Sequence, residues 1–150
     1  MNYYKGIICV LFISMTSCIE SDVSIEYEKW IEYFESYGIE KAELDNSVAL
    51  ILRTHECNPS VEEILWWRDN YETLNVNQIL LIIETRLPSV ANAFIETHKL
   101  DFIKIIDDEF LISKTNLVAS TPKKILFGES DIVKSDGIGT GSHPITFISH

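Results

Sequence analysis

Two hydrophobic periodicities, one following the other, place the strongest constraint on the fold of this chain. In the first half, apolar residues recur every three or four positions, as they do on the buried face of a helix. After His98 the apolar residues stand in short runs of the kind that form strands. Helices first and strands last, without alternation, predict an α+β fold: an N-terminal helical unit of about four helices, then a small, mostly antiparallel C-terminal sheet.

The helical unit is predicted to extend from Ser24 to His98. Gly38 is expected to end its first helix, and Ser60 with Glu63 matches a capping box that would begin its third. Pro88 should kink or restart the last helix. The apolar positions of the four stripes are Tyr27, Trp30, Phe34; Leu44, Val48, Ile51, Leu52; Ile64, Trp67, Tyr71; and Ile79, Ile83, Leu87.

Short β-like runs after His98 predict the strands of the sheet. They span residues 101–106, 109–113, 116–119, 124–127 and 132–134, with 145–148 as a further candidate. The first two runs would form a hairpin, and the acidic residues Asp107 and Asp108 between them would make its solvated turn.

The charge of the chain excludes one class of function. With 12 Lys and Arg against 23 Asp and Glu among 150 residues, the formal net charge is −11. A general nucleic-acid binder needs a basic surface to displace counterions from phosphates, so no nucleic-acid partner is expected. Most of the excess lies in residues 18–72, which hold 14 acidic and four basic side chains.

The first 17 residues have the pattern of an export signal. Lys5 precedes the uncharged apolar run of residues 6–15, and small residues follow. The charge-free stretch is shorter than the roughly 20 residues that span a bilayer. We therefore expect a signal peptide over 1–17, a polar tether over 18–24 and a single α+β domain over 25–150.

The sequence Met15-Thr16-Ser17-Cys18 resembles the lipobox of bacterial lipoproteins. Met15 stands where that family usually has Leu, and Ser17 where it has Ala or Gly. The resemblance implies that Cys18 is lipidated and becomes the mature amino terminus. It therefore implies an exported protein held at a membrane by lipid on Cys18, facing the periplasm or the cell exterior.

Removal of the leader would leave Cys57 as the only cysteine besides Cys18, so no disulfide is expected within the domain. A buried or half-buried bystander is the preferred interpretation of Cys57, and a catalytic thiol is the alternative. Because adjacent helical residues point about 100° apart, His55-Glu56-Cys57 cannot close on one ion, and no metal site is predicted. No cofactor is predicted either.

The first and third predicted helices carry a candidate surface for a partner. Tyr33 precedes Phe34, and Trp66 precedes Trp67. Because neighbouring residues cannot share one helix face, Tyr33 and Trp66 are expected to be partly exposed among acidic side chains. The preferred function is an acidic, inhibitor-like or immunity-like module that docks a basic protein, with no catalytic residue assigned. The alternative is a small envelope hydrolase with Asp107 or Asp108 as acid/base groups near His143. The residues predicted to bind the partner are Glu28, Glu32, Glu35, Tyr33 and Trp66.

Overall fold

The computed structural model of the protein describes residues 24–54 and 57–149. The predicted signal peptide and Cys18 lie outside the described residues. Within the described part, no helix is long and apolar enough to cross a membrane.

Helices and strands alternate along the chain as far as β4, which β5 follows directly, and two short 3-10 helices are also present. The elements are α1 (Ile25–Ser36), η1 (Lys41–Glu43), β1 (Ser47–Arg53), α2 (Asn58–Asn70), η2 (Tyr71–Thr73), β2 (Gln78–Glu84), α3 (Pro88–His98), β3 (Ile103–Asp107), α4 (Leu111–Thr115), β4 (Lys123–Phe127), β5 (Ile132–Gly137) and α5 (Pro144–Ile148).

The five strands form one mixed sheet in the order β3-β2-β1-β4-β5. Strand β1 is parallel to β2, which is parallel to β3, and their register places Arg53 beside Glu84 and Glu84 beside Asp107. Strand β4 is antiparallel to both β1 and β5. The carboxyl ends of the three parallel strands therefore lie together at one edge of the sheet, where parallel α/β sheets usually carry their sites.

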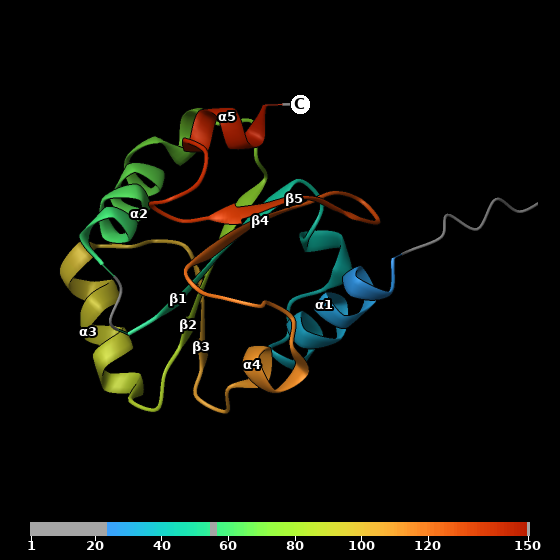
Figure 1. The fold of residues 1–150 in the computed structure, drawn as a ribbon, viewed down its shortest axis with the longest axis horizontal. Coiled ribbons are helices and arrows are strands. Elements are labelled where there is room, and N and C mark those ends of the chain that lie inside the picture. The colour runs from blue at the N-terminus through green and yellow to red at the C-terminus, as the bar shows by residue number, and fades with distance from the viewer. Residues whose placement is uncertain (1–23, 55–56, 150) are drawn as a thin grey trace, which may run out of the picture.

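Helices cover both faces of the sheet. Helices α2, α3 and α5 lie on one face, and α1 and α4 lie on the other (Figure 1). The core under α1 is aromatic: the rings of Trp30, Phe34 and Phe127 lie 5.6–5.7 Å apart, centroid to centroid. The core under α2 and α3 contains Trp67 and the apolar side chains of β1 and β2.

The predicted α+β order is wrong, because two of the expected helices are strands. The segments that carry the second and fourth stripes form β1 and β2. Every residue from Ser47 to Leu52 is buried, and so is every residue from Ile79 to Glu84. A parallel strand covered on both faces has a continuous apolar sequence, and periodicity alone does not separate that run from a buried helix.

The C-terminal predictions are partly confirmed. Runs 101–106, 124–127 and 132–134 overlap β3, β4 and β5, but 109–113 and 145–148 overlap α4 and α5, and 116–119 is not a strand. Strand β3 pairs with β2 in place of the expected hairpin. Asp107 is buried rather than solvated, because its carboxylate accepts hydrogen bonds from the main-chain N–H groups of Leu111 (2.9 Å) and Ile112 (3.0 Å).

Candidate functional site

Cys57 occupies the N-cap of α2, directly beyond the carboxyl end of β1. Its carbonyl oxygen accepts the first hydrogen bonds of the helix, from the N–H groups of Ser60 (3.0 Å) and Val61 (3.3 Å). Pro59 stands in the first turn, where a missing N–H costs no helical hydrogen bond. Cys57 is exposed, so the prediction that it is buried or half-buried is wrong.

Ser60 faces Cys57 across the first turn of α2. The Sγ atom of Cys57 lies 3.4 Å from the Oγ atom of Ser60. Ser60 is fully buried, and its hydroxyl donates a hydrogen bond to the carbonyl oxygen of Ile138 (3.3 Å). Ser60 therefore does not cap α2 as predicted, because the helix begins two residues earlier, at Asn58.

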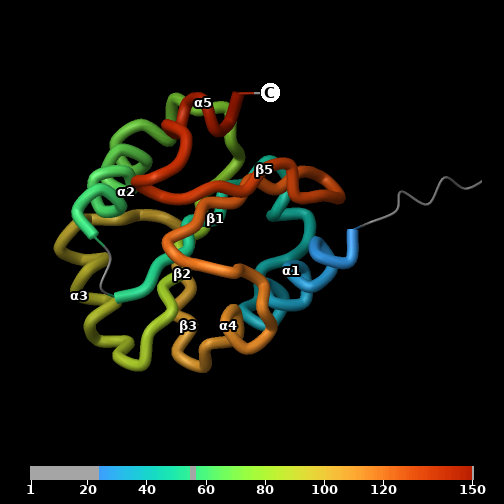
Figure 2. The backbone as a smooth tube through the Cα atoms, viewed as in Figure 1, coloured from blue at the N-terminus to red at the C-terminus, as the bar shows by residue number. Residues whose placement is uncertain are grey.

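Ile138 joins this turn to the segment that precedes β4. Its N–H donates a hydrogen bond to the carbonyl oxygen of Pro122 (3.4 Å), and the peptide bond between Thr121 and Pro122 is cis. Ile138, a residue of the glycine-rich segment 137–141, thus links Pro122 to Ser60, the residue that faces Cys57. Figure 2 shows this C-terminal segment passing beside the N-terminal half of α2.

Gly139 allows the glycine-rich segment to approach the main chain of α2 closely. A Cβ atom at this position would lie 2.6 Å from the carbonyl carbon of Pro59 and 2.6 Å from the nitrogen of Ser60. The φ angle of Gly139 is +74°, which L side chains rarely adopt. The segment therefore packs main chain against main chain at the start of α2.

A buried ion pair also stabilises the contact between α2 and the glycine-rich segment. The Nζ atom of Lys124 lies 2.6 Å from the Oε1 atom of Glu63, with the lysine side chain fully buried and the glutamate 10% exposed. The other carboxylate oxygen of Glu63 accepts a hydrogen bond from the N–H of Gly139 (2.6 Å). Lys124 also donates to the carbonyl oxygen of Ser142. Glu63 is thereby fixed within the fold, and it does not form the predicted capping box with Ser60.

Asp136 holds the end of the glycine-rich segment. Hydrogen bonds from the hydroxyl and the N–H of Ser142, both 2.7 Å, and from the N–H of Gly137 (2.7 Å) lower the pKa of its carboxyl group to about 2. The carboxylate is therefore charged at neutral pH and closes the loop between β5 and α5.

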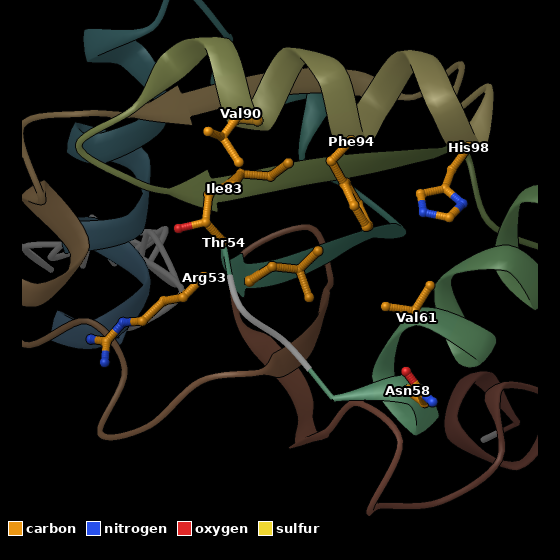
Figure 3. Close-up of a pocket in the computed structure, with 10 residues that line it drawn as sticks. Arg53, Thr54, Asn58, Val61, Ile83, Val90, Phe94 and His98 are labelled. Atoms are coloured by element: carbon orange, nitrogen blue, oxygen red, sulfur yellow. The ribbon is translucent and has the colours of Figure 1, made fainter.

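A cavity of about 370 Å³ adjoins the N-terminus of α2, and no residue of the glycine-rich segment lines it. Figure 3 shows Val90, Phe94 and His98 of α3 on one side of it and Asn58 and Val61 of α2 on the other. The lining is mainly apolar with a few polar groups, as in most small-molecule sites.

The residues predicted to bind a partner do not form one surface around Tyr33 and Trp66. Glu28, Glu32 and Glu35 are exposed on α1. Tyr33 is buried, 5% exposed, because its ring packs on Trp30 and Phe34. Trp66 lies on α2, across the sheet from α1, and its ring is 4.9 Å from that of His143.

The carboxylates of the hydrolase alternative are not beside His143. Asp107 accepts hydrogen bonds from α4 and from the hydroxyl of Tyr37, on the face of the sheet covered by α1. His143 precedes α5 on the opposite face. Within residues 24–54 and 57–149, no cluster of three or more His, Cys, Asp or Glu side chains could hold a metal ion.

The two-residue spacing between Cys57 and Ser60 is that of a redox motif, but local sequence patterns do not reveal it. Thioredoxin-like redox motifs have two cysteines separated by two residues near a βαβ unit. In the sequence Cys57-Asn58-Pro59-Ser60, Ser60 stands where that motif has its second cysteine. Because the apolar run before it predicts a helix, the cysteine is expected at a helix C-terminus, where this spacing has no redox meaning.

No family model and no curated protein matches the chain. Solved structures do match its fold. StoA from Bacillus subtilis has a TM-score of 0.53 at 16% identity, over 63% of this chain and 74% of that one. A secreted disulfide oxidoreductase from Mycobacterium tuberculosis, homologous to Escherichia coli DsbE, has a TM-score of 0.51 at 14% identity, over 61% and 69%. An uncharacterised thioredoxin-like protein from Porphyromonas gingivalis has a TM-score of 0.53 at 13% identity, over 66% and 67%.

These similarities and the geometry of α2 correct the predicted function. The group that the fold exposes at the start of α2 is a thiol, and one structure with this fold is a disulfide oxidoreductase. The predictions of an acidic binding module and of a carboxylate-dependent hydrolase are therefore wrong. At this level of identity the matches establish architecture alone: the chain has a thioredoxin-like fold.

Proposed function

We propose that the protein carries out thiol–disulfide exchange through Cys57. The observation that carries the proposal is an exposed thiol at the N-cap of α2, with Ser60 Oγ 3.4 Å from its sulfur. The partial positive charge of a helix N-terminus favours the thiolate, which is the nucleophilic form of cysteine. The fold shared with the secreted Mycobacterium tuberculosis disulfide oxidoreductase supports the same chemistry.

The exchange has two balanced steps. The Cys57 thiolate attacks one sulfur of a substrate disulfide, a new S–S bond forms to Cys57, and the other substrate sulfur leaves as a thiolate. A second thiolate, from the substrate or from a small thiol, then attacks the substrate sulfur and releases Cys57. Serine at position 60 cannot perform that second attack, so the protein is a monothiol exchanger with a long-lived mixed disulfide.

The experiment is to trap that mixed disulfide in the full chain. Incubation with hydroxyethyl disulfide should add one mercaptoethanol group at Cys57, identified by peptide mass, and added thiol should remove it. A Cys57→Ser variant is the matched control and should show no adduct in that peptide. A native chain whose Cys57 stays unmodified while other cysteines react would contradict the proposal.

We propose in addition that the protein is exported and anchored by lipid on Cys18. The export-like leader and its lipobox-like end support this location, as does the secretion of the Mycobacterium tuberculosis oxidoreductase. Disulfide exchange is also best suited to compartments where disulfides persist. A Cys18→Ala variant should lose fatty-acid labelling, and unchanged labelling of that variant would refute the anchor.

A further inference from the structure

A second hollow, of about 510 Å³, lies at the carboxyl ends of β1 and β2. Thr54 lines both this hollow and the apolar cavity, three residues before Cys57. Its hydroxyl accepts a hydrogen bond from that of Thr85 (3.3 Å), which connects the ends of the two strands. We call this hollow the arginine groove, and its lining residues are Arg53, Thr54, Glu84, Thr85, Arg86, Leu87, Phe110 and Thr121.

The arginine groove reaches the same segment as the site at Cys57. Thr121, at its edge, is the residue before cis-Pro122, whose carbonyl oxygen is bonded to Ile138. The groove therefore extends from Arg53 and Thr54, at the end of the strand that leads to Cys57, to Thr121, whose neighbour Pro122 is linked through Ile138 to Ser60 of α2. A substrate attached to the Cys57 sulfur could place its neighbouring groups there.

Arg53 is held in position by Glu84 and Ser113. Its Nε atom lies 2.7 Å from the Oε2 atom of Glu84, and its Nη2 donates to the hydroxyl of Ser113 (3.0 Å). The Glu84 side chain is fully buried, and its Oε1 atom accepts from the N–H of Ser113 (3.1 Å). The Arg53 side chain is 55% exposed, whereas that of Glu84 is fully buried.

Arg86 supplies a second positive charge to the groove. Among the described residues, no carboxylate forms an ion pair with it. Its guanidinium lies 5.6 Å from the centroid of the Phe110 ring, which positions it over the groove wall. Arg86 is exposed. In a chain with a net charge of −11, this groove carries two arginines against one buried, hydrogen-bonded glutamate.

We infer that the arginine groove selects disulfides that carry a carboxylate close to the reacting sulfur. The inference rests on the proposed exchange at Cys57 and names its substrate class. Arg86 would attract the carboxylate before reaction and Arg53 would orient it, because charge complementarity acts mainly on the rate of association. The carboxylate can belong to an acidic peptide or to a small acidic thiol compound.

The test compares disulfides of similar size and different charge. The second-order rate of adduct formation at Cys57 is measured for dithiodipropionate, hydroxyethyl disulfide and cystamine, which are anionic, neutral and cationic. In Arg86→Gln the anionic-to-neutral rate ratio should fall by about twofold to fivefold, and the cationic-to-neutral ratio should rise. Arg86→Lys keeps the charge and should restore both ratios. Lys104→Gln, an equal charge change on the exposed side of β3 and outside the groove, should leave them unchanged.

The outcomes separate this inference from the function on which it rests. If Cys57 reacts with none of the three disulfides, the proposed exchange itself fails. If Cys57 reacts with hydroxyethyl disulfide but the ratios are the same in Arg86→Gln and the native chain, only the arginine groove is refuted. A parallel pair of peptide disulfides, with Glu or Gln beside the cysteine, distinguishes the two sources. A larger effect of Arg86→Gln on the Glu peptide than on dithiodipropionate assigns a protein substrate, and the reverse assigns a small acid.

Discussion

The Oγ atom of Ser60 lies 3.4 Å from the Sγ atom of Cys57 and donates its hydrogen bond to the carbonyl oxygen of Ile138. Ser60 thus stands where a second thiol would be close enough to form a disulfide with only a small adjustment, since a disulfide needs its two sulfurs about 2 Å apart. Ser60 has a hydroxyl where the proposed exchange would need a second thiol to be completed within the chain.

Ser60→Cys should therefore change how the mixed disulfide resolves. The new thiol can attack the Cys57 sulfur, so the adduct with hydroxyethyl disulfide should give way to an intramolecular disulfide and release a second equivalent of mercaptoethanol. Intact mass and thiol titration measure both products. Persistence of the adduct in Ser60→Cys, at the lifetime seen in the native chain, would show that the two positions do not meet in solution.

The ion pair between Lys124 and Glu63 predicts a large stability effect. Lys124→Met leaves the buried Glu63 carboxylate without its cation and should lower the free energy of unfolding by about 3–5 kcal/mol. Urea unfolding measures the loss. The double variant Lys124→Met/Glu63→Gln removes both charges and should recover part of it. A single variant within about 0.5 kcal/mol of the native chain would mean that the pair is solvated.

Two glycines with the same backbone conformation form a matched pair. Gly38 has φ +77°, and a Cβ atom added there would have no atom within 4 Å, whereas Gly139 has φ +74° with Pro59 and Ser60 in contact. Gly38→Ala should cost about 1 kcal/mol from the left-handed conformation alone. Gly139→Ala adds a main-chain clash and should cost about 1–3 kcal/mol more. Equal melting temperatures for the two variants would contradict the packing at the start of α2.

Asp136 predicts a pH dependence with a defined sign. Its folded pKa of about 2 lies below the ordinary aspartate value of about 3.9, so its stabilising contribution is fully present above pH 4 and is lost as pH falls through 2. Asp136→Asn should therefore be less stable than the native chain at pH 7 by about 1 kcal/mol, with the carboxylate only partly buried. The difference should shrink towards pH 2, and a difference that is the same at both pH values would refute the assignment.

Local sequence signals predicted several elements correctly. The aromatic stripe of Tyr27, Trp30 and Phe34 predicted α1, and the structure buries all three residues. Gly38 adopts a positive φ beyond the end of α1, and Pro88 begins α3, as expected. These signals depend on a few consecutive residues, which is why they could be interpreted without tertiary information.

The sheet and the site required information that local patterns do not carry. The interiors of β1 (48–52) and β2 (79–83) are apolar because helices cover both of their faces, and only the completed fold shows that cover. A helix predicted over β1 also misplaces Cys57, since it puts the cysteine after a helix rather than at the start of α2. The contact between Ile138 and Ser60 joins residues 78 positions apart, and no spacing in the sequence predicts it.

The most direct test of the central claim is the alkylation rate of Cys57 at neutral pH. The full chain is treated with iodoacetamide in the native state and in urea, and peptide mass mapping follows Cys57 separately from Cys9 and Cys18. If the N-terminus of α2 stabilises the Cys57 thiolate, this residue should react several times faster in the native chain than in the unfolded one. A native rate equal to or below the unfolded rate would show that the fold does not activate Cys57.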